Sequence, residues 1–331
     1  MEIFACILIL YWGFFASTVV NGGSLTSYAS VSASPTLDVT KFGAIGDGKA
    51  DDTKAFVATW KAACNNRTSN AKITVPQGKA YLVNQTGFWG PCKSTSITFE
   101  ILGTIVAPLK SAWTSKASDC WLCFYRVNSL NVVGNEVGVI DGQGDDCIAI
   151  NGGTSNVNIT QVACGPGHGI SVGSLGHNGA HDEVQGILVN KCCFNGTRNG
   201  ARIKTWQGGS GFARNISFSD ITLIAADNPI IIDQFYCNGR ESAVQVSDVT
   251  YTGIQGTTVC KKATINFSCS DTVPCTNITL NNINITSAAP NSPLHSRCIN
   301  AQVTAHLTEP PVNCQAHIQA LKGEKNKHAS K

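Results

Sequence analysis

Three short stretches of the chain carry side chains suited to acid–base chemistry. Asp145 and Asp146 are adjacent, and His168 stands between two glycines in "CGPGHGISVGSLG". Arg202 and Lys204 are two residues apart in "RIKTWQGGSG", so on a β-strand their side chains would point the same way. Together these groups would suit hydrolysis of an acidic sugar polymer. One carboxylic acid would protonate the leaving glycosidic oxygen, another carboxylate would activate water, and the cations would hold a sugar carboxylate.

Each stretch also has an ordinary structural interpretation. Asp-Asp pairs and histidines in Gly-rich segments are common in turns, and Arg and Lys two apart usually mark a solvated strand face. The combination, in this order, favours a site. Asp146 and His168 are 22 residues apart, and His168 and Lys204 are 36 apart. Both steps are close to a repeat that runs through the chain.

That repeat consists of short strands with a period near thirty residues. The segments "VNITQVAC", "GILVNKCC", "ISFSDITL", "VQVSDVTY" and "ITLNNINI" align with steps of 30, 29, 28 and 34 residues. The aligned positions are Val162, Cys192, Ile221, Val249 and Ile283. Strands that recur at this period without helices predict an all-β solenoid, a right-handed parallel β-helix. A β-sandwich is the alternative, although its strands usually recur about every ten residues.

One long helix is expected before the repeats. Asp51 or Asp52 can cap a helix that runs to about Cys64, and this helix would cover the open end of the first coil. The predicted segments are a signal peptide over residues 1–22, a Ser-rich linker over 23–36, the β-helix domain over 37–315 and a polar tail over 316–331.

Several features predict an exported protein. The uncharged apolar run from Ile3 to Val20, followed by small polar residues, is typical of a secretory signal peptide. Fifteen cysteines, or fourteen after loss of Cys6, indicate disulfides. Eight Asn-x-Ser/Thr sequons indicate a glycoprotein; they begin at Asn66, Asn84, Asn158, Asn195, Asn215, Asn266, Asn277 and Asn284. We expect a secreted, extracellular protein that does not stay in the membrane after signal cleavage.

The composition excludes several other classes. Apolar residues make up 43% of the chain and charged residues 14%, which is not the composition of a disordered protein. The formal charge of +3 would favour an acidic polymer only weakly. No Lys/Arg stripe with interleaved aromatics predicts nucleic-acid binding, and no Cys/His spacing predicts a zinc site. We therefore expect a monomer without metal or cofactor.

Six phrases together form a specific pattern over most of residues 38–300. They are "FGAIGDGKADDTKAF", "GVIDGQG", "GDDCIAI", "GPGHGISVGSLG", "RIKTWQGGSG" and "NPIIIDQFYC". In this pattern the chain resembles plant polygalacturonases, glycoside hydrolases of the pectinase family with a right-handed parallel β-helix. "GHGISVGSLG" and "RIKTWQGG" are highly specific together, whereas "GDDC" is weak by itself.

The resemblance implies cleavage of α-1,4-galacturonosyl bonds of pectin, in the cell wall, with inversion at the anomeric carbon. It makes Asp145 the general acid and Asp146 one of the residues that hold and activate the attacking water. His168 would support the acid.

The resemblance also implies how pectin or polygalacturonate is held. Arg202 and Lys204 would bind the galacturonate carboxylate, and Tyr236 in "DQFYC" would contact the substrate. The implied disulfides are Cys147–Cys164 and Cys269–Cys275.

The chain departs from the family pattern at one place. Members of the family carry an Asn-Thr-Asp phrase on the coil before "GDDC", whose aspartate helps to position water, and this sequence has no such phrase. Gly144 runs directly into Asp145, where relatives have tens of residues. We expect an internal deletion of two to three coils, which a solenoid tolerates because each coil contacts mainly its neighbours. Asp141, next to this junction, matches a structural turn.

Three outcomes are open at this point. The protein is a pectin hydrolase impaired by the loss of one water-orienting aspartate, a catalytically inactive relative that binds pectin, or a chain that is not stably made.

Overall fold

A computed structural model describes residues 36–67, 70–113, 120–236, 243–289 and 292–314. The predicted signal peptide, all of the Ser-rich linker but residue 36, and the polar tail lie outside the described residues. No helix among the residues described is long and apolar enough to cross a membrane.

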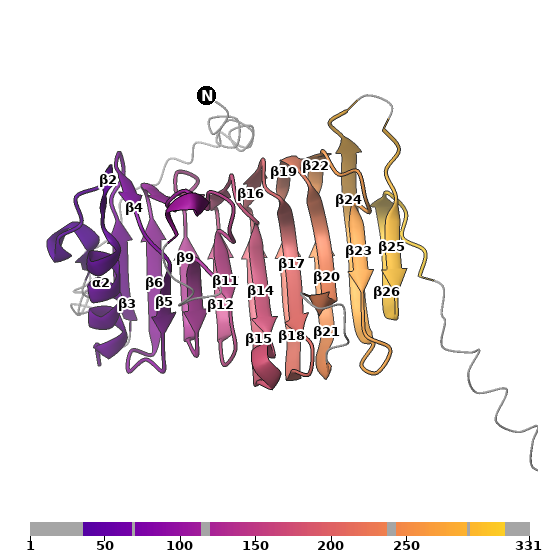
Figure 1. The fold of residues 1–331 in the computed structure, drawn as a ribbon, viewed down its shortest axis with the longest axis horizontal. Coiled ribbons are helices and arrows are strands. Elements are labelled where there is room, and N and C mark those ends of the chain that lie inside the picture. The colour runs from indigo at the N-terminus through magenta and orange to yellow at the C-terminus, as the bar shows by residue number, and fades with distance from the viewer. Residues whose placement is uncertain (1–35, 68–69, 114–119, 237–242, 290–291, 315–331) are drawn as a thin grey trace, which may run out of the picture.

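The described residues wind into a stack of coils whose strands pair in parallel (Figure 1). One sheet has eight strands. They are β5 (Thr86–Trp89), β8 (Leu122–Tyr125), β11 (Ile148–Ile150), β14 (Ile170–Leu175), β17 (Asn199–Trp206), β20 (Asn228–Tyr236), β23 (Ile265–Ser268) and β25 (Ser296–Ile299). The predicted parallel β-solenoid is confirmed.

The remaining strands form an eighteen-stranded sheet that carries the rest of each coil. They are β1 (Thr36–Asp38), β2 (Asp47–Asp51), β3 (Asn70–Val75), β4 (Ala80–Leu82), β6 (Ser96–Ile101), β7 (Thr104–Val106), β9 (Asn128–Val133), β10 (Val139–Asp141), β12 (Ser155–Thr160), β13 (Ala163–Cys164), β15 (His181–Asn190), β16 (Cys193–Asn195), β18 (Ser210–Ser219), β19 (Thr222–Ala226), β21 (Ala243–Thr252), β22 (Gln255–Thr258), β24 (Cys275–Ser287) and β26 (Ala301–Glu309). In strands such as β6 and β3 alternate residues are buried, so apolar side chains of successive coils stack inside the solenoid.

The helix α2 (Thr53–Asn65) forms where it was expected, at the N-terminal end of the stack (Figure 1). Phe56 and Trp60 are buried against the first coils. The carboxylate of Asp52 does not cap the helix but accepts hydrogen bonds from the amides of Ile45 and Gly46. The role of α2 as a cap of the solenoid stays a prediction. Three short 3₁₀ helices complete the part of the chain that the structure describes: η1 (Val39–Phe42), η2 (Lys110–Ala112) and η3 (His177–Gly179).

One position of the predicted repeat is wrong. Val249 lies within β21 and pairs with Ile216 and Ile278. The residue one coil after Ile221 is Ile254, because the Gln255 amide donates to the carbonyl of Ile221.

The error arose from a repeated "SD" phrase at two different corners of the coil. Asp220 and Asp248 both adopt left-handed φ angles, 52° and 54°. Asp248, however, stacks above Asn215, whereas Gly253 stacks above Asp220. Polar and glycine residues recur at every such corner because they tolerate this backbone conformation, so local sequence similarity cannot tell the corners apart.

The stack continues without a break through the expected deletion junction. β10 pairs with β7 and β13, and β11 pairs with β8 and β14. Residues 142–147 form the turn between β10 and β11, held by hydrogen bonds from the Gly142 amide to Pro166 (2.8 Å) and from the Cys147 amide to Gly169 (2.9 Å). The coil that carries Asp145 therefore lies directly on the coil that carries β8.

Candidate active site

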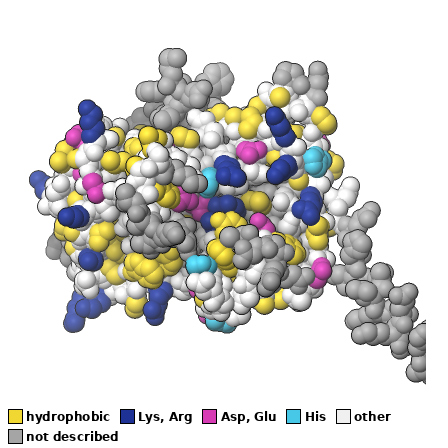
Figure 2. Space-filling view, in the orientation of Figure 1, with side chains coloured by type: hydrophobic (Ala, Val, Ile, Leu, Met, Phe, Trp, Pro, Cys, Tyr) yellow, Lys and Arg dark blue, Asp and Glu magenta, His cyan; other side chains and the backbone are white. Residues whose placement is uncertain are grey.

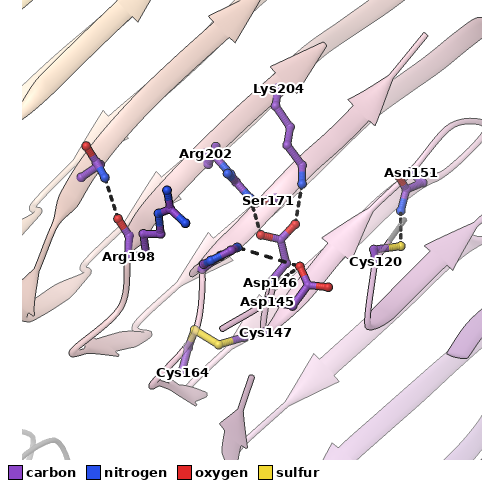
Figure 3. A network of polar contacts seen from close by, with 12 residues as sticks. Cys120, Asp145, Asp146, Cys147, Asn151, Cys164, Ser171, Arg198, Arg202 and Lys204 are labelled. Atoms are coloured by element: carbon purple, nitrogen blue, oxygen red, sulfur yellow. Dashed lines mark hydrogen bonds and ion pairs between the residues drawn. A yellow bond between two sulfur atoms is a disulfide. The ribbon is translucent and has the colours of Figure 1, made fainter. Parts of the chain in front are cut away.

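The structure brings five of the predicted site residues together beside the eight-stranded sheet, and Figure 3 labels the two acids and the two cations among them. Asp145 and Asp146 lie in the turn before β11, His168 lies in the turn before β14, and Arg202 and Lys204 lie on β17. These are three successive strands of the sheet, so residues far apart in the sequence become neighbours.

Two links fix the turns that carry the acids and the histidine. The backbone amide of His168 donates to the carbonyl of Asp145 at 2.7 Å. A disulfide joins Cys147 to Cys164, one residue from the acid pair and four from the histidine. The other pairing implied by the family, Cys269–Cys275, is also present. Further disulfides are Cys64–Cys92, Cys120–Cys123 and Cys298–Cys314.

Asp146 is fully buried and ion-paired through both carboxylate oxygens. One oxygen contacts the Arg202 guanidinium, and the other accepts a hydrogen bond from Lys204 Nζ at 2.7 Å. Burial alone would raise the pKa of Asp146, but the two cations more than offset burial and hold the pKa below its ordinary value. Asp146 is therefore an ionised carboxylate, and each of its oxygens contacts a cation.

Arg202 and Lys204 are engaged by the protein itself. Their side chains are only 9% and 4% exposed. Arg202 Nε also donates to Ser171 Oγ at 2.9 Å. Lys204 Nζ lies 5.2 Å from the ring centroid of Tyr236, a cation–π distance. The two cations point toward Asp146, and little of either is open to a sugar carboxylate.

Asp145 has the opposite character. Its side chain is 15% exposed, and burial, followed by the negative charge of Asp146, raises its pKa to about 6. His168 Nδ1 lies 3.9 Å from Asp145 Oδ1, beyond hydrogen-bond distance. Burial lowers the pKa of His168 to about 4. Between these values the carboxyl of Asp145 is protonated and His168 is neutral, which is the state a general acid requires.

These groups fit proton chemistry better than metal binding. Oxygens of Asp145 and Asp146 and a ring nitrogen of His168 lie within 4.8 Å of one another, close enough to share an ion. Arg202 and Lys204, however, occupy both oxygens of Asp146 and would repel a metal cation.

Two further aspartates lie near the cluster. Asp141 accepts hydrogen bonds from the Gln143 amide (3.2 Å) and its Nε2 (3.0 Å), so its carboxylate stabilises a turn. Asp233 was missed from the sequence. It lies on β20 beside Lys204, and burial raises its pKa. The step of 29 residues from Lys204 to Asp233, close to one coil, was the signal that could have found it.

Tyr236 is the last residue of β20, and its ring faces Lys204, which binds Asp146. Its ring meets Trp206 edge-on at 5.9 Å, and Trp206 lies 4.4 Å from the His177 ring. These rings form a row beside the charged cluster. In Figure 2 the acidic, basic and histidine side chains gather in the middle of this face, with hydrophobic side chains next to them.

On this parallel β-solenoid a carboxyl with a raised pKa lies beside an ion-paired carboxylate, and such a pair suits the hydrolysis of a polysaccharide. The family model described as "Glycosyl hydrolases family 28" matches residues 142–307. The chain belongs to this family, and its relatives assign it to the polygalacturonases of that family.

Two plant relatives illustrate the match. A "Probable polygalacturonase" of Arabidopsis thaliana is 35% identical over 374 aligned positions, which cover 85% of this chain and 81% of the relative. A "Polygalacturonase" of Prunus persica is 34% identical over 382 positions, which cover 86% of this chain and 95% of the relative. Among solved structures, a polygalacturonase from Erwinia carotovora covers 81% of this chain and 69% of its own, with 22% identity and a TM-score of 0.43.

Proposed function

We propose that the protein is a secreted hydrolase that cleaves α-1,4-galacturonosyl bonds of pectin with inversion, at a reduced rate. The observation that carries the proposal is the largely buried carboxyl of Asp145, which lies beside the ion-paired Asp146 and 3.9 Å from His168 Nδ1, where burial raises its pKa to about 6. Asp145 would donate its proton to the glycosidic oxygen as the bond to the anomeric carbon breaks. The disulfides support an oxidising, extracellular location.

The reduced rate follows from the lack of a free base. An inverting pair of carboxyl groups stands roughly 6.5–9.5 Å apart, which leaves room for the attacking water. Oxygens of Asp145 and Asp146 come within 4.8 Å of each other, and Asp146 is fully buried. We infer that Asp146, buried and ion-paired with two cations, does not hold the attacking water. A missing acid–base group lowers a rate by roughly 10²–10⁴-fold.

The alignments support a missing segment. The aligned 374 positions shared with the Arabidopsis thaliana relative exceed the 331 residues of the whole chain, although only 85% of this chain is covered. The relative therefore has many residues without a counterpart here. We infer that most of them fall immediately before the acid pair, because the Asn-Thr-Asp phrase is absent and Gly144 runs directly into Asp145.

A second candidate function is pectin binding without cleavage. It is favoured by the ion-paired state of Asp146, because one carboxylate faces two cations and a positive charge is left over. When Asp145 is protonated, it carries no negative charge that could neutralise this excess. The excess positive charge therefore attracts a polyanion.

Incubation of the purified protein with polygalacturonate tests both candidates. The hydrolase candidate predicts new reducing ends, whose anomeric form by NMR is inverted, and predicts their loss in Asp145→Asn. The absence of new reducing ends, together with binding that Lys204→Ala abolishes, would contradict hydrolysis and support the binding candidate. Absence of both cutting and binding would reject both candidates.

A further inference from the structure

A second cavity opens on the eight-stranded sheet, at the carboxyl ends of β5, β8 and β11. Its volume is about 380 Å³, which is in the size range of small-molecule sites. None of the residues assigned to proton transfer lines it. The polar and aromatic lining residues that matter here are Trp89, Tyr125, Arg126, Asn151, His177 and His181.

One wall of the cavity is a stacked aromatic pair. The rings of Trp89 and Tyr125 lie 4.1 Å apart and 6° from parallel. Parallel pairing of β5 with β8 places these two residues in register. Trp89 is nevertheless 57% exposed, so a large flat apolar surface faces solvent. Such a surface suits the apolar C–H face of a pyranose ring, with the polar edge of the sugar left to other groups.

The other walls supply a positive charge. Arg126 is exposed, and its guanidinium has no carboxylate partner among the residues that the structure describes. Asp182 also lines the cavity, but its carboxylate accepts a hydrogen bond from the Gly176 amide at 2.8 Å. An unpaired guanidinium next to an aromatic platform matches a sugar that carries a carboxylate.

A row of rings connects this cavity with the catalytic cluster. His177 lines the cavity and contacts Trp206, Trp206 contacts Tyr236, and the Tyr236 ring lies below Lys204. Asp146 and Asn151 lie at opposite ends of β11, roughly 16 Å apart at ~3.3 Å per residue. The cavity is thus separate from the position of bond cleavage and on the same face of the protein.

The position of the cavity depends on the junction before Asp145. Because β11 pairs directly with β8, Trp89 lies two coils from β11, about 10 Å along the stack. Additional coils at this point would move the aromatic pair away from the catalytic cluster.

We propose that this cavity is a binding subsite for a uronic acid unit of the substrate, remote from the bond that is cleaved. The sugar ring lies against Trp89, and its carboxylate pairs with Arg126. This inference rests on the proposed function, since it assumes that the substrate is an acidic polysaccharide.

Calorimetric titration with a galacturonate tetramer tests the subsite. The titrations use the Asp145→Asn background, so that the ligand is not consumed. Trp89→Ala should weaken binding at least tenfold, and Arg126→Gln about fivefold. Two control variants should change the Kd less than twofold. Ile45→Ala removes an equally exposed apolar side chain elsewhere, and Arg214→Gln removes a charge from the other sheet. A neutral galactose tetramer should bind at least tenfold more weakly.

The outcomes separate this inference from the proposed function. If the tetramer binds and Trp89→Ala changes its Kd less than twofold, the subsite is wrong while pectin recognition stands. If the galactose tetramer binds as tightly as the galacturonate tetramer, the role of Arg126 is wrong. If no galacturonate oligomer binds even to the protein with its natural Asp145, the proposed function fails, and the subsite fails with it.

Discussion

Asp145 and Asp146 are adjacent in the chain, yet their surroundings move their pKa values in opposite directions. Burial and the neighbouring charge raise the pKa of Asp145 to about 6, whereas Arg202 and Lys204 hold that of Asp146 below its ordinary value. At pH 5 the pair therefore consists of one protonated acid and one carboxylate. The difference comes from the side-chain directions in the turn, because Asp146 points toward Arg202 and Lys204 (Figure 3) and is ion-paired with both.

The first prediction concerns the pH dependence of cleavage. Asp145 must carry a proton to act as the acid, so kcat/KM should fall about tenfold for each pH unit above 6. Initial rates on polygalacturonate between pH 4 and 8 measure this slope. A rate that stays constant from pH 6 to 8 would exclude Asp145 as the acid.

The second prediction concerns stability at Asp145. The folded pKa of about 6 lies above the ordinary 3.8, so the folded state binds this proton more tightly than the unfolded state. The resulting stabilisation is present below pH 4 and is lost as the pH rises to about 6. Asp145→Asn avoids this loss and should be more stable than the natural protein by about 3 kcal/mol above pH 6. Urea unfolding at pH 4 and pH 7.5 measures the gap, which should be absent at pH 4; an equal gap at both pH values would contradict it.

The third prediction concerns the buried ion cluster. Asp146→Ala leaves Arg202 and Lys204 buried and unpaired, which should cost about 3–5 kcal/mol of unfolding free energy. Lys72→Ala is the matched control, since its pair with Glu100 is partly exposed (2.8 Å) and should contribute only about 0–1 kcal/mol. Equal losses in the two variants would show that the cluster does not stabilise the fold.

The sequence predicted the solenoid because its period is a property of strand and turn lengths. The spacing also predicted one shared surface, since steps of about one coil return the chain to the same face. The residues predicted to share it were Asp145, Asp146, His168, Arg202 and Lys204. Spacing says which side chains share a face, but not which of them pair. The ion pairs of Asp146 with Arg202 and Lys204 depend on how deeply the turn before β11 buries the Asp146 side chain. No pattern in the sequence encodes that burial.

The aromatic pair was missed for a related reason. Trp89 and Tyr125 are 36 residues apart, and neither lies in a recognisable phrase. Coil lengths vary from 22 residues between Ala149 and Ser171 to 36 between Gly87 and Cys123. With such variation only the hydrogen-bond register identifies the residues that stack, as the misplaced Val249 also shows.

The fourth prediction concerns the disulfide beside the site. Replacing Cys147 and Cys164 by serine opens a loop of 17 residues and should cost about 3 kcal/mol. The control is the Cys298–Cys314 pair, which closes a loop of 16 residues near the C-terminal end of the stack. Both double variants should lose similar stability, measured by urea unfolding.

Of the two disulfides, only Cys147–Cys164 holds the turns of Asp145 and His168. When the two double variants are compared at the same fraction of folded protein, only the loss of this disulfide should weaken galacturonate binding. If removal of Cys298–Cys314 weakened binding equally, the position of the Cys147–Cys164 bridge would be irrelevant to the site.

The pairing of β11 with β8 limits how chains of this kind can differ in length. Phe124 and Ile150 stack on each other and both point inward. The strands after the junction therefore have the same orientation about the long axis of the solenoid as the strands before it. Loss of a fraction of a turn would rotate every later strand and turn its apolar side chains toward solvent. Coils can therefore be gained or lost here only as whole turns, whatever the length of the segments between strands. Each such change alters which residues face the substrate together while leaving the interior intact.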